Sequence, residues 1–212
     1  ICAPYCKAPL HIHVEGELIS VPYIELTLDV MKSFGIEVRH EGLRDFYVPQ
    51  GVYTAPADYM VEGDASSASY PLAAAAIAKG KVRVLGVGHE SAQGDVAFVM
   101  VLRKMGVKVD IGPDWIECDG SGCSLHGVNL DLNDIPDAAM TVAVLALFAD
   151  SPMTISGIAS WRVKETDRIA AMSAELRKVG ADVRETTDSI TITPPAKLLP
   201  ATIETYNDHR MA

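Results

Sequence analysis

An internal repeat constrains the fold of this chain more than any other feature of its sequence. Glycines that close predicted helices stand at nearly equal intervals, at Gly35, Gly106 and Gly180, and strand-like segments follow them (GIEV, GVKV, GADV). Aspartates at predicted helix starts recur at almost the same interval, at Asp64, Asp137 and Asp208. Because two independent markers share one period, the chain is predicted to contain repeated supersecondary units of roughly 72 residues.

Each unit is predicted to run in the order β-α-β-α-β-β, from the periodicity of its apolar residues. The last complete unit has predicted strands at 128–132 and 153–158, helices at 138–149 and after 168, and a hairpin formed by 183–184 and 189–193. The middle unit has a predicted helix at 66–78, a strand at 81–87, a helix from 94 to 106, and a hairpin at 107–111 and 115–118. The first has a strand at 10–14, a helix capped by Ser20, and a hairpin at 36–39 and 46–48.

Units packed side by side would bring several helix N-termini to one surface. Their dipoles would make this surface locally positive. The chain of 212 residues is otherwise acidic, with a net charge of -10, which argues against a general affinity for nucleic acid or an anionic membrane. Its longest apolar helical run, 138–149, is too short to span a bilayer. We therefore expect local clusters to bind a small anion.

Four cysteines stand at Cys2, Cys6, Cys118 and Cys123, at spacings that match no zinc pair. Free thiols are typical of a reducing compartment, which predicts a cytoplasmic protein. We find no plausible metal cage, P-loop or nucleophile elbow in the sequence, so its chemistry is expected to depend on carboxylates, cations and helix ends.

The segment WRVKETDR at residues 161–168 carries three cations and two carboxylates immediately before an amphipathic helix. Thr166 or Asp167 is a good N-cap, so the cations gather at a helix N-terminus, which favours phosphate or carboxylate binding. A carboxylate among them, Glu165, suggests proton transfer. The alternative is a solvated ion-pair cluster that caps a surface helix.

Asp137 begins the most apolar predicted helix, where it either caps the helix or accepts a proton or a substrate hydroxyl. For Asp64, at the same place in the preceding unit, we favour the cap. Ser20 and Tyr23 lie in the first turn of their helix, where two hydroxyls either bind a phosphate or cap.

His209 and Arg210 occupy the positions that Ala138 and Ala139 hold one unit earlier. Large polar side chains in place of small apolar ones indicate a site rather than core packing. Arg210 is suited to hold a carboxylate through two hydrogen bonds.

Four motifs, WRVKETDR, GDASSASY, DIPDAAMT and TYNDHRMA, closely resemble the 5-enolpyruvylshikimate-3-phosphate synthase (3-phosphoshikimate 1-carboxyvinyltransferase) family. The resemblance implies an inside-out α/β barrel fold of two lobes, each of three β-α-β-α-β-β units, with the active site between the lobes. Residues 1–62 would be the last unit of the shikimate-phosphate-binding lobe. Residues 63–212 would be the first two units of the other lobe and the start of its third.

The resemblance also implies an activity: transfer of the carboxyvinyl group of phosphoenolpyruvate to the 5-hydroxyl of shikimate 3-phosphate, without metal or cofactor. It assigns proton transfer to Asp137 and Glu165. The residues implied to bind shikimate 3-phosphate are Ser20, Tyr23, Asp137, Ser160 and Lys164. Those implied to bind phosphoenolpyruvate are Arg168, His209 and Arg210. Ser160 replaces the usual Asn of the family, so this contact is expected to be altered.

Several segments of the family's active site lie outside these residues, so we expect the chain to be part of a longer enzyme and inactive alone. The complete protein is expected to be a monomer and a target of glyphosate, with no nucleic-acid or membrane partner. One alternative is UDP-N-acetylglucosamine enolpyruvyl transferase, which has the same fold and chemistry. The others are a non-catalytic anion-binding repeat module and a segment that folds only with its other half.

Overall fold

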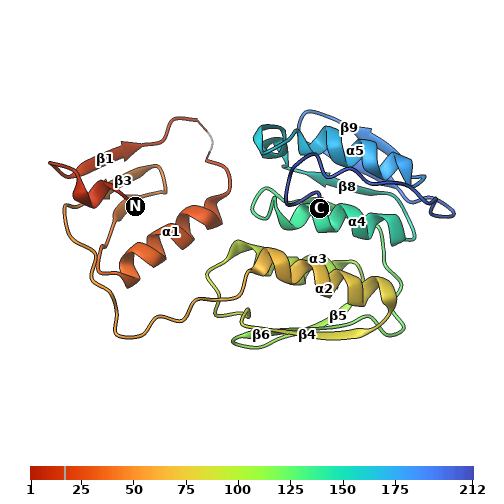
Figure 1. The fold of residues 1–212 in the computed structure, drawn as a ribbon, viewed down its shortest axis with the longest axis horizontal. Coiled ribbons are helices and arrows are strands. Elements are labelled where there is room, and N and C mark those ends of the chain that lie inside the picture. The colour runs from red at the N-terminus through yellow and green to blue at the C-terminus, as the bar shows by residue number, and fades with distance from the viewer. Residues whose placement is uncertain (17) are drawn as a thin grey trace. The chain divides into compact units, whose positions relative to one another are not determined.

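The computed structural model describes residues 1–16 and 18–212, and it divides into two compact units (Figure 1). Unit 1 comprises Ile1–Glu62 and Ala92–Gly94, and unit 2 comprises Gly63–Ser91 and Asp95–Ala212. The assignment of the two segments to two lobes stays a prediction.

The described residues of unit 1 form one antiparallel sheet, one α-helix and a short 3-10 helix. Its elements are η1 (Ala3–Tyr5), β1 (Leu10–His13), α1 (Val21–Ser33), β2 (Arg39–Glu41) and β3 (Asp45–Val48). The strand order is β1-β3-β2, so the predicted hairpin is present and its second strand is central. Among the described residues, its buried apolar cluster is small and contains Met31, Ile36 and Val48, and Phe46 is also buried.

Ser20 precedes α1 in a left-handed conformation, with φ of 55°, and its side chain makes no capping hydrogen bond. The capping alternative for this hydroxyl is therefore wrong. At the other end, the Gly35 N–H donates to Lys32 O at 2.9 Å, and Gly35 has a φ of 86°, which a glycine adopts at little cost.

Unit 2 contains two sheets covered by helices. Its first part comprises α2 (Ala65–Ala78), β4 (Lys81–Leu85), η2 (Gly94–Ala97, whose first residue belongs to unit 1), α3 (Phe98–Lys104), β5 (Lys108–Ile111) and β6 (Trp115–Asp119). Its second part comprises β7 (Asn129–Asp131), α4 (Ala138–Leu145), η3 (Ala146–Phe148), β8 (Met153–Ser156), η4 (Ala159–Val163), α5 (Arg168–Lys178), β9 (Asp182–Glu185) and β10 (Ile190–Thr193).

The sheets confirm the predicted repeat, because all three share one topology. A strand, a helix and a hairpin follow one another, and the second strand of the hairpin always lies in the middle: β1-β3-β2, β4-β6-β5 and β8-β10-β9. The last sheet gains β7, which pairs with β8 in parallel, so the second part of unit 2 has the full order β-α-β-α-β-β. Residues 61–63, before α2, form no strand, so the middle repeat lacks its first strand.

The helices α2 and α4 are buried on most sides, as their Ala-rich sequences predict. Between them, the hydroxyls of Ser69 and Thr141 lie 2.8 Å apart, which satisfies two buried polar groups. The last predicted turn of α4 is instead the 3-10 helix η3. Within the described residues no helix is long and apolar enough to cross a membrane.

The segment that begins at Asp208 forms turns, so the prediction that it opens a helix is wrong. The Asp208 carboxylate does accept the Arg210 N–H at 2.9 Å, as an N-cap would.

An apolar cavity of about 430 Å³ lies between α2, α4, α5 and residues 203–212. Its lining includes Ala73, Ile77, Val144, Leu176 and Ile203. The walls are mostly apolar, although Tyr70, Glu175 and Arg210 also line the cavity.

Replacement of Asp64 tests the role of the repeated aspartates in the fold. The Asp64 carboxylate accepts the Ser66 N–H at 3.0 Å, so Asp64→Ala should lower the unfolding free energy of unit 2 by about 1 kcal/mol. Trp115 and Trp161 both lie in unit 2, so urea unfolding followed by fluorescence reports on it. Asp134→Ala, at an exposed position, should change stability by less than about 0.5 kcal/mol. Equal losses in the two variants would contradict the assignment.

Candidate active site

Arg168, the first residue of α5, organises a polar cluster in unit 2. Its side chain is only 2% exposed, and the guanidinium contacts three carboxylates. Nε and Nη2 donate to the two oxygens of Asp208 at 2.8 and 3.0 Å, Nη1 donates to Asp137 at 3.1 Å, and Nη2 also donates to Glu165 at 2.9 Å. One buried cation thus fixes both carboxylates that the sequence suggests for proton transfer.

Asp208 is the buried counter-ion of this arginine, with a side chain that is 0% exposed. Burial alone would raise the pKa of Asp208, but the hydrogen bonds from the Arg168 guanidinium and the Arg210 N–H hold that pKa below its ordinary value. Burial likewise acts to lower the pKa of Arg168, yet Asp208, Asp137 and Glu165 together raise it. The Arg168–Asp208 pair is therefore fully charged and bidentate.

Asp137 precedes α4 but makes no capping hydrogen bond with its side chain. Its carboxylate instead faces cations: Arg168 at 3.1 Å, Arg210 at 3.4 Å and Lys164 at 3.9 Å. The fully buried Trp161 donates its Nε1–H to Pro136 O at 2.7 Å, which joins η4 to the residue before Asp137. The purely structural interpretation of Asp137 as a helix cap is therefore wrong.

Arg210 lies on the other side of Asp137, and its side chain is 13% exposed. Nη1 donates to the Tyr70 hydroxyl of α2 at 3.3 Å. Burial acts to lower the pKa of Arg210, while the Tyr70 bond and the charge of Asp137 raise it above its ordinary value. The Nε–H of Arg210 is buried and has no hydrogen-bond partner among the described residues, which leaves a donor for an anionic ligand.

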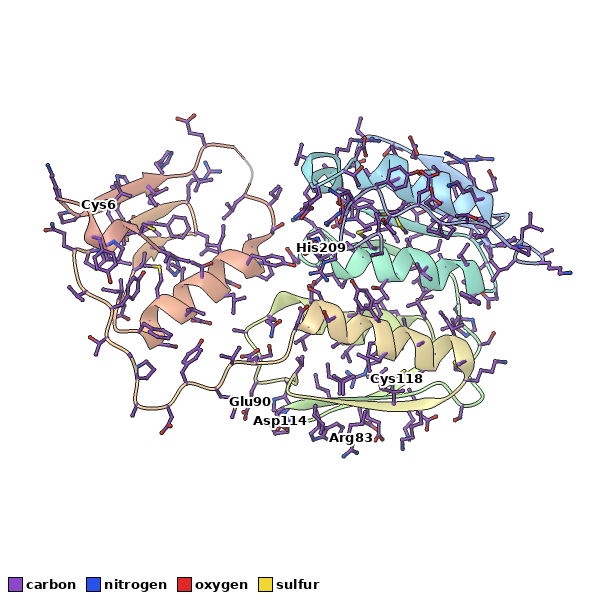
Figure 2. The ribbon with its side chains drawn as sticks, viewed as in Figure 1. Cys6, Arg83, Glu90, Asp114, Cys118 and His209 are labelled. Atoms are coloured by element: carbon purple, nitrogen blue, oxygen red, sulfur yellow. The ribbon has the colours of Figure 1, made fainter. Side chains whose placement is uncertain are left out.

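Glu165 and His209 form the exposed edge of the cluster, with side chains 48% and 64% exposed. His209 Nδ1 lies 3.5 Å from Glu165 Oε1 and 3.7 Å from Asp208 Oδ1. Figure 2 shows His209 near the end of unit 2 at which α4 begins. Glu165 is thus held by Arg168 on one side and open to a ligand on the other.

The cluster suits anions better than a metal ion. Glu165, Asp208 and His209 offer ligand atoms that lie within 4.8 Å of one another. The Arg168 guanidinium already contacts both carboxylates, so a divalent cation placed there would meet a fixed positive charge at close range.

Three helix N-termini add partial positive charge to this region. α2, α4 and α5 begin at the same end of unit 2 (Figure 1), and the charge of Arg210 acts on Asp64 as well as on Asp137. The expectation that the sequence repeats bring helix N-termini to one surface therefore holds within unit 2. The cations of this region can hold the anionic groups of a ligand, and the carboxylates and the imidazole can transfer protons to and from it.

Two residues of unit 2 that the sequence suggests, Arg162 and Ser160, make none of the contacts described above. Arg162 pairs with Asp167 at 2.7 Å and donates to backbone carbonyls of the β9–β10 turn, so its role is structural. Ser160 lies half-buried in η4. Ser20 and Tyr23 belong to unit 1, at the start of α1.

Asp208, Trp161 and Tyr70 are site residues that sequence reasoning does not assign. The repeat identifies Asp208 only as a helix start. Its position beside His209 and Arg210 is a usable signal that it belongs to the site, but its counter-ion is Arg168, 40 residues away in sequence. No sequence signal indicates that Tyr70, 140 residues away, contacts Arg210.

Comparison with known proteins agrees with this architecture. A solved EPSP synthase from Acinetobacter baumannii superposes on 99% of the chain with a TM-score of 0.77 at 23% identity, and the chain covers 49% of that protein. The enolpyruvyl transferase NikO from Streptomyces tendae superposes on 89% of the chain, with a TM-score of 0.66 at 18% identity, and 43% of NikO is covered. The chain therefore has part of the enolpyruvyl transferase fold.

Sequence similarity is more specific than the fold. The family model for EPSP synthase (3-phosphoshikimate 1-carboxyvinyltransferase) matches residues 1–212, and the chain belongs to this family. It is 57% identical to the 3-phosphoshikimate 1-carboxyvinyltransferase of Serratia proteamaculans and 58% identical to that of Pectobacterium atrosepticum, over 99% of its length in each case. The chain spans about half the length of these curated relatives, 49% of each.

Replacement of Asp208 by Asn tests the buried ion pair. Removal of one partner of a buried pair should lower the unfolding free energy of unit 2 by about 3 kcal/mol at pH 7. The folded-state pKa of Asp208 is lowered, so this contribution is present above the unfolded pKa of about 3.9 and is lost as the pH falls through the folded value. The difference between wild type and Asp208→Asn should therefore be constant from pH 7 to about 5 and shrink below pH 4.

Urea unfolding at each pH, followed by tryptophan fluorescence, measures this difference. Asp182→Asn is the matched control, because Asp182 is 66% exposed and lies 4.0 Å from Arg184; it should cost less than about 1 kcal/mol. A loss in Asp208→Asn no larger than in this control would contradict the role of the buried pair.

Proposed function

We propose that the complete protein that contains this chain transfers the carboxyvinyl group of phosphoenolpyruvate to the 5-hydroxyl of shikimate 3-phosphate, and releases phosphate. Family membership supports the reaction. The observation that carries the proposal is the Arg168 guanidinium, which holds Asp137 and Glu165 at 3.1 and 2.9 Å. Two carboxylates fixed about one cation provide an acid and a base beside a seat for anions.

In the proposed reaction, Asp137 accepts the proton of the 5-hydroxyl as its oxygen bonds to C2 of phosphoenolpyruvate. Glu165 gives a proton to the methylene carbon, C3. Together the two steps replace the C2=C3 double bond by a new C–O bond at C2 and a new C–H bond at C3, and so form a tetrahedral adduct. The bond between C2 of the tetrahedral adduct and the phosphate oxygen then breaks, and the leaving phosphate takes the proton held by Asp137. A proton leaves the methyl carbon to Glu165, which restores the double bond and returns both carboxyl groups to their starting states. General acid–base groups of this kind contribute about 10²–10⁴-fold each.

The cations have separate tasks in this proposal. Arg168, Arg210 and His209 hold the carboxylate and phosphate of phosphoenolpyruvate, and the buried Nε–H of Arg210 is a donor suited to that anion. Lys164 binds shikimate 3-phosphate together with Ser20, Tyr23 and Ser160. Because two anions repel each other, fixed cations and helix N-termini are needed to bring them together.

We further propose that residues 1–62 belong to one lobe of the complete protein and residues 63–212 to the other. The four cysteines are free, which fits a reducing cytoplasm. In this proposal the enzyme acts in chorismate biosynthesis as a monomer, uses no cofactor, binds neither nucleic acid nor membrane, and is a target of glyphosate.

Glu165→Gln in the complete protein tests the proposed chemistry. The amide keeps the size of the side chain but cannot transfer a proton, so kcat should fall at least about 100-fold while KM for shikimate 3-phosphate changes little. Phosphate release under saturating substrates measures this. Glu185→Gln, at an exposed position of β9, should leave kcat unchanged. Unaltered turnover in Glu165→Gln would contradict proton transfer by Glu165, and absence of turnover in the unaltered complete protein would favour a non-catalytic anion-binding module.

The isolated chain should release no phosphate from the two substrates, because it spans only about half of the length of its relatives. In the complete protein, a UDP-sugar should not replace shikimate 3-phosphate. Turnover by the isolated chain, or turnover by the complete protein with UDP-N-acetylglucosamine, would refute the respective statement.

A further inference from the structure

The outer face of the sheet of unit 1 carries two histidines and an aspartate that the proposed reaction does not use. His11 and His13 alternate along β1, so both side chains project from the same face. Asp45, on the central strand β3, lies directly opposite His13 in the antiparallel register. Residues in this relation have Cβ atoms about 4.5–5.5 Å apart.

Both imidazoles point at one carboxylate oxygen. His11 Nε2 and His13 Nδ1 each lie 2.8 Å from Asp45 Oδ1. Two nitrogen ligands and one oxygen ligand are thus gathered from two strands.

A second carboxylate extends the same row across the sheet. Glu41 of β2 is the cross-strand partner of Asp45, so His13, Asp45 and Glu41 follow one another on this face. The cation nearest in the register, Arg39, stacks on the Tyr47 ring at 4.2 Å, and Tyr47 lies between Arg39 and His11 in the strand pairing. The two carboxylates make this end of the face negative and suited to a cation.

We propose that His11, His13 and Asp45 form a binding site for a divalent transition-metal ion such as Zn²⁺, with Glu41 or water as the fourth ligand. Imidazole nitrogens and carboxylate oxygens bind zinc at about 2.0–2.2 Å in tetrahedral geometry. The side chains of His11 and His13 are 51% and 52% exposed, so both rings can rotate away from Asp45 and toward each other to admit the ion.

The ion would stabilise unit 1 by joining its edge strand to its central strand. β1 is the edge of the sheet, and its partner β3 follows in the chain only after α1 and β2. The buried core of unit 1 is small: among the described residues its hydrophobic cluster contains Met31, Ile36 and Val48, and Phe46 is also buried. A ligand bound only by the folded state stabilises that state by mass action, so unit 1 should respond strongly.

Zinc titration of the 212-residue chain tests the proposal. Cys2 and Cys6 are exposed thiols that bind zinc themselves, so the titration is done in a Cys2→Ser/Cys6→Ser background. ZnCl₂ should bind with one-to-one stoichiometry by calorimetry at pH 7.5, and the ring resonances of His11 and His13 should shift in NMR spectra. His11→Asn/His13→Asn should weaken zinc binding at least about tenfold, because loss of a group that only hydrogen-bonds to a metal ligand already lowers metal affinity by about 10–100-fold.

Two controls separate this site from other histidine–carboxylate pairs. His126 also contacts a carboxylate, with Nδ1 2.7 Å from Asp150, but without a second histidine, and His209 belongs to the candidate active site. His126→Asn and His209→Asn should each bind zinc with unchanged affinity. The proposal is overturned if no zinc binds, if the double variant binds as tightly as its parent, or if either control removes the binding.

Discussion

The Arg168 guanidinium is the interaction on which the candidate site depends. A charge buried to this degree is strongly unfavourable unless it is paired and hydrogen-bonded. Asp208, Asp137 and Glu165 meet that requirement, and they come from three separate places: the segment after β10, the start of α4 and the segment before α5. The same contacts that satisfy the buried cation therefore bring the two proposed proton carriers together.

The repeat explains how such a site can arise from structurally equivalent positions. Asp64, Asp137 and Asp208 occupy the same place in successive units, yet each has a different role. Asp64 caps α2, Asp137 faces three cations without capping, and Asp208 is the buried partner of Arg168. Because the sequence repeats share one topology, the starts of successive repeats lie close together within unit 2. Asp137 and Asp208 can therefore both reach Arg168.

Much of this arrangement could be predicted from the sequence, because periodicity and caps are local signals. The helices, the hairpins, the buried character of α2 and α4, and the cap at Asp167 all follow from such patterns. Tertiary contacts could not be predicted in this way. A capping aspartate and an aspartate that faces a guanidinium look the same in sequence, which is why Asp137 had two interpretations. The alignment of His13 with Asp45 depends on strand register, which the sequence leaves open.

A crystal structure of the complete protein with shikimate 3-phosphate and phosphoenolpyruvate bound tests the central claim most directly. Our account predicts the anionic groups of phosphoenolpyruvate within hydrogen-bond distance of Arg168 and Arg210, the 5-hydroxyl at Asp137, and Glu165 beside the methylene carbon. Ligands bound away from the Arg168 cluster, or Asp137 and Glu165 both remote from the reacting atoms, would contradict it.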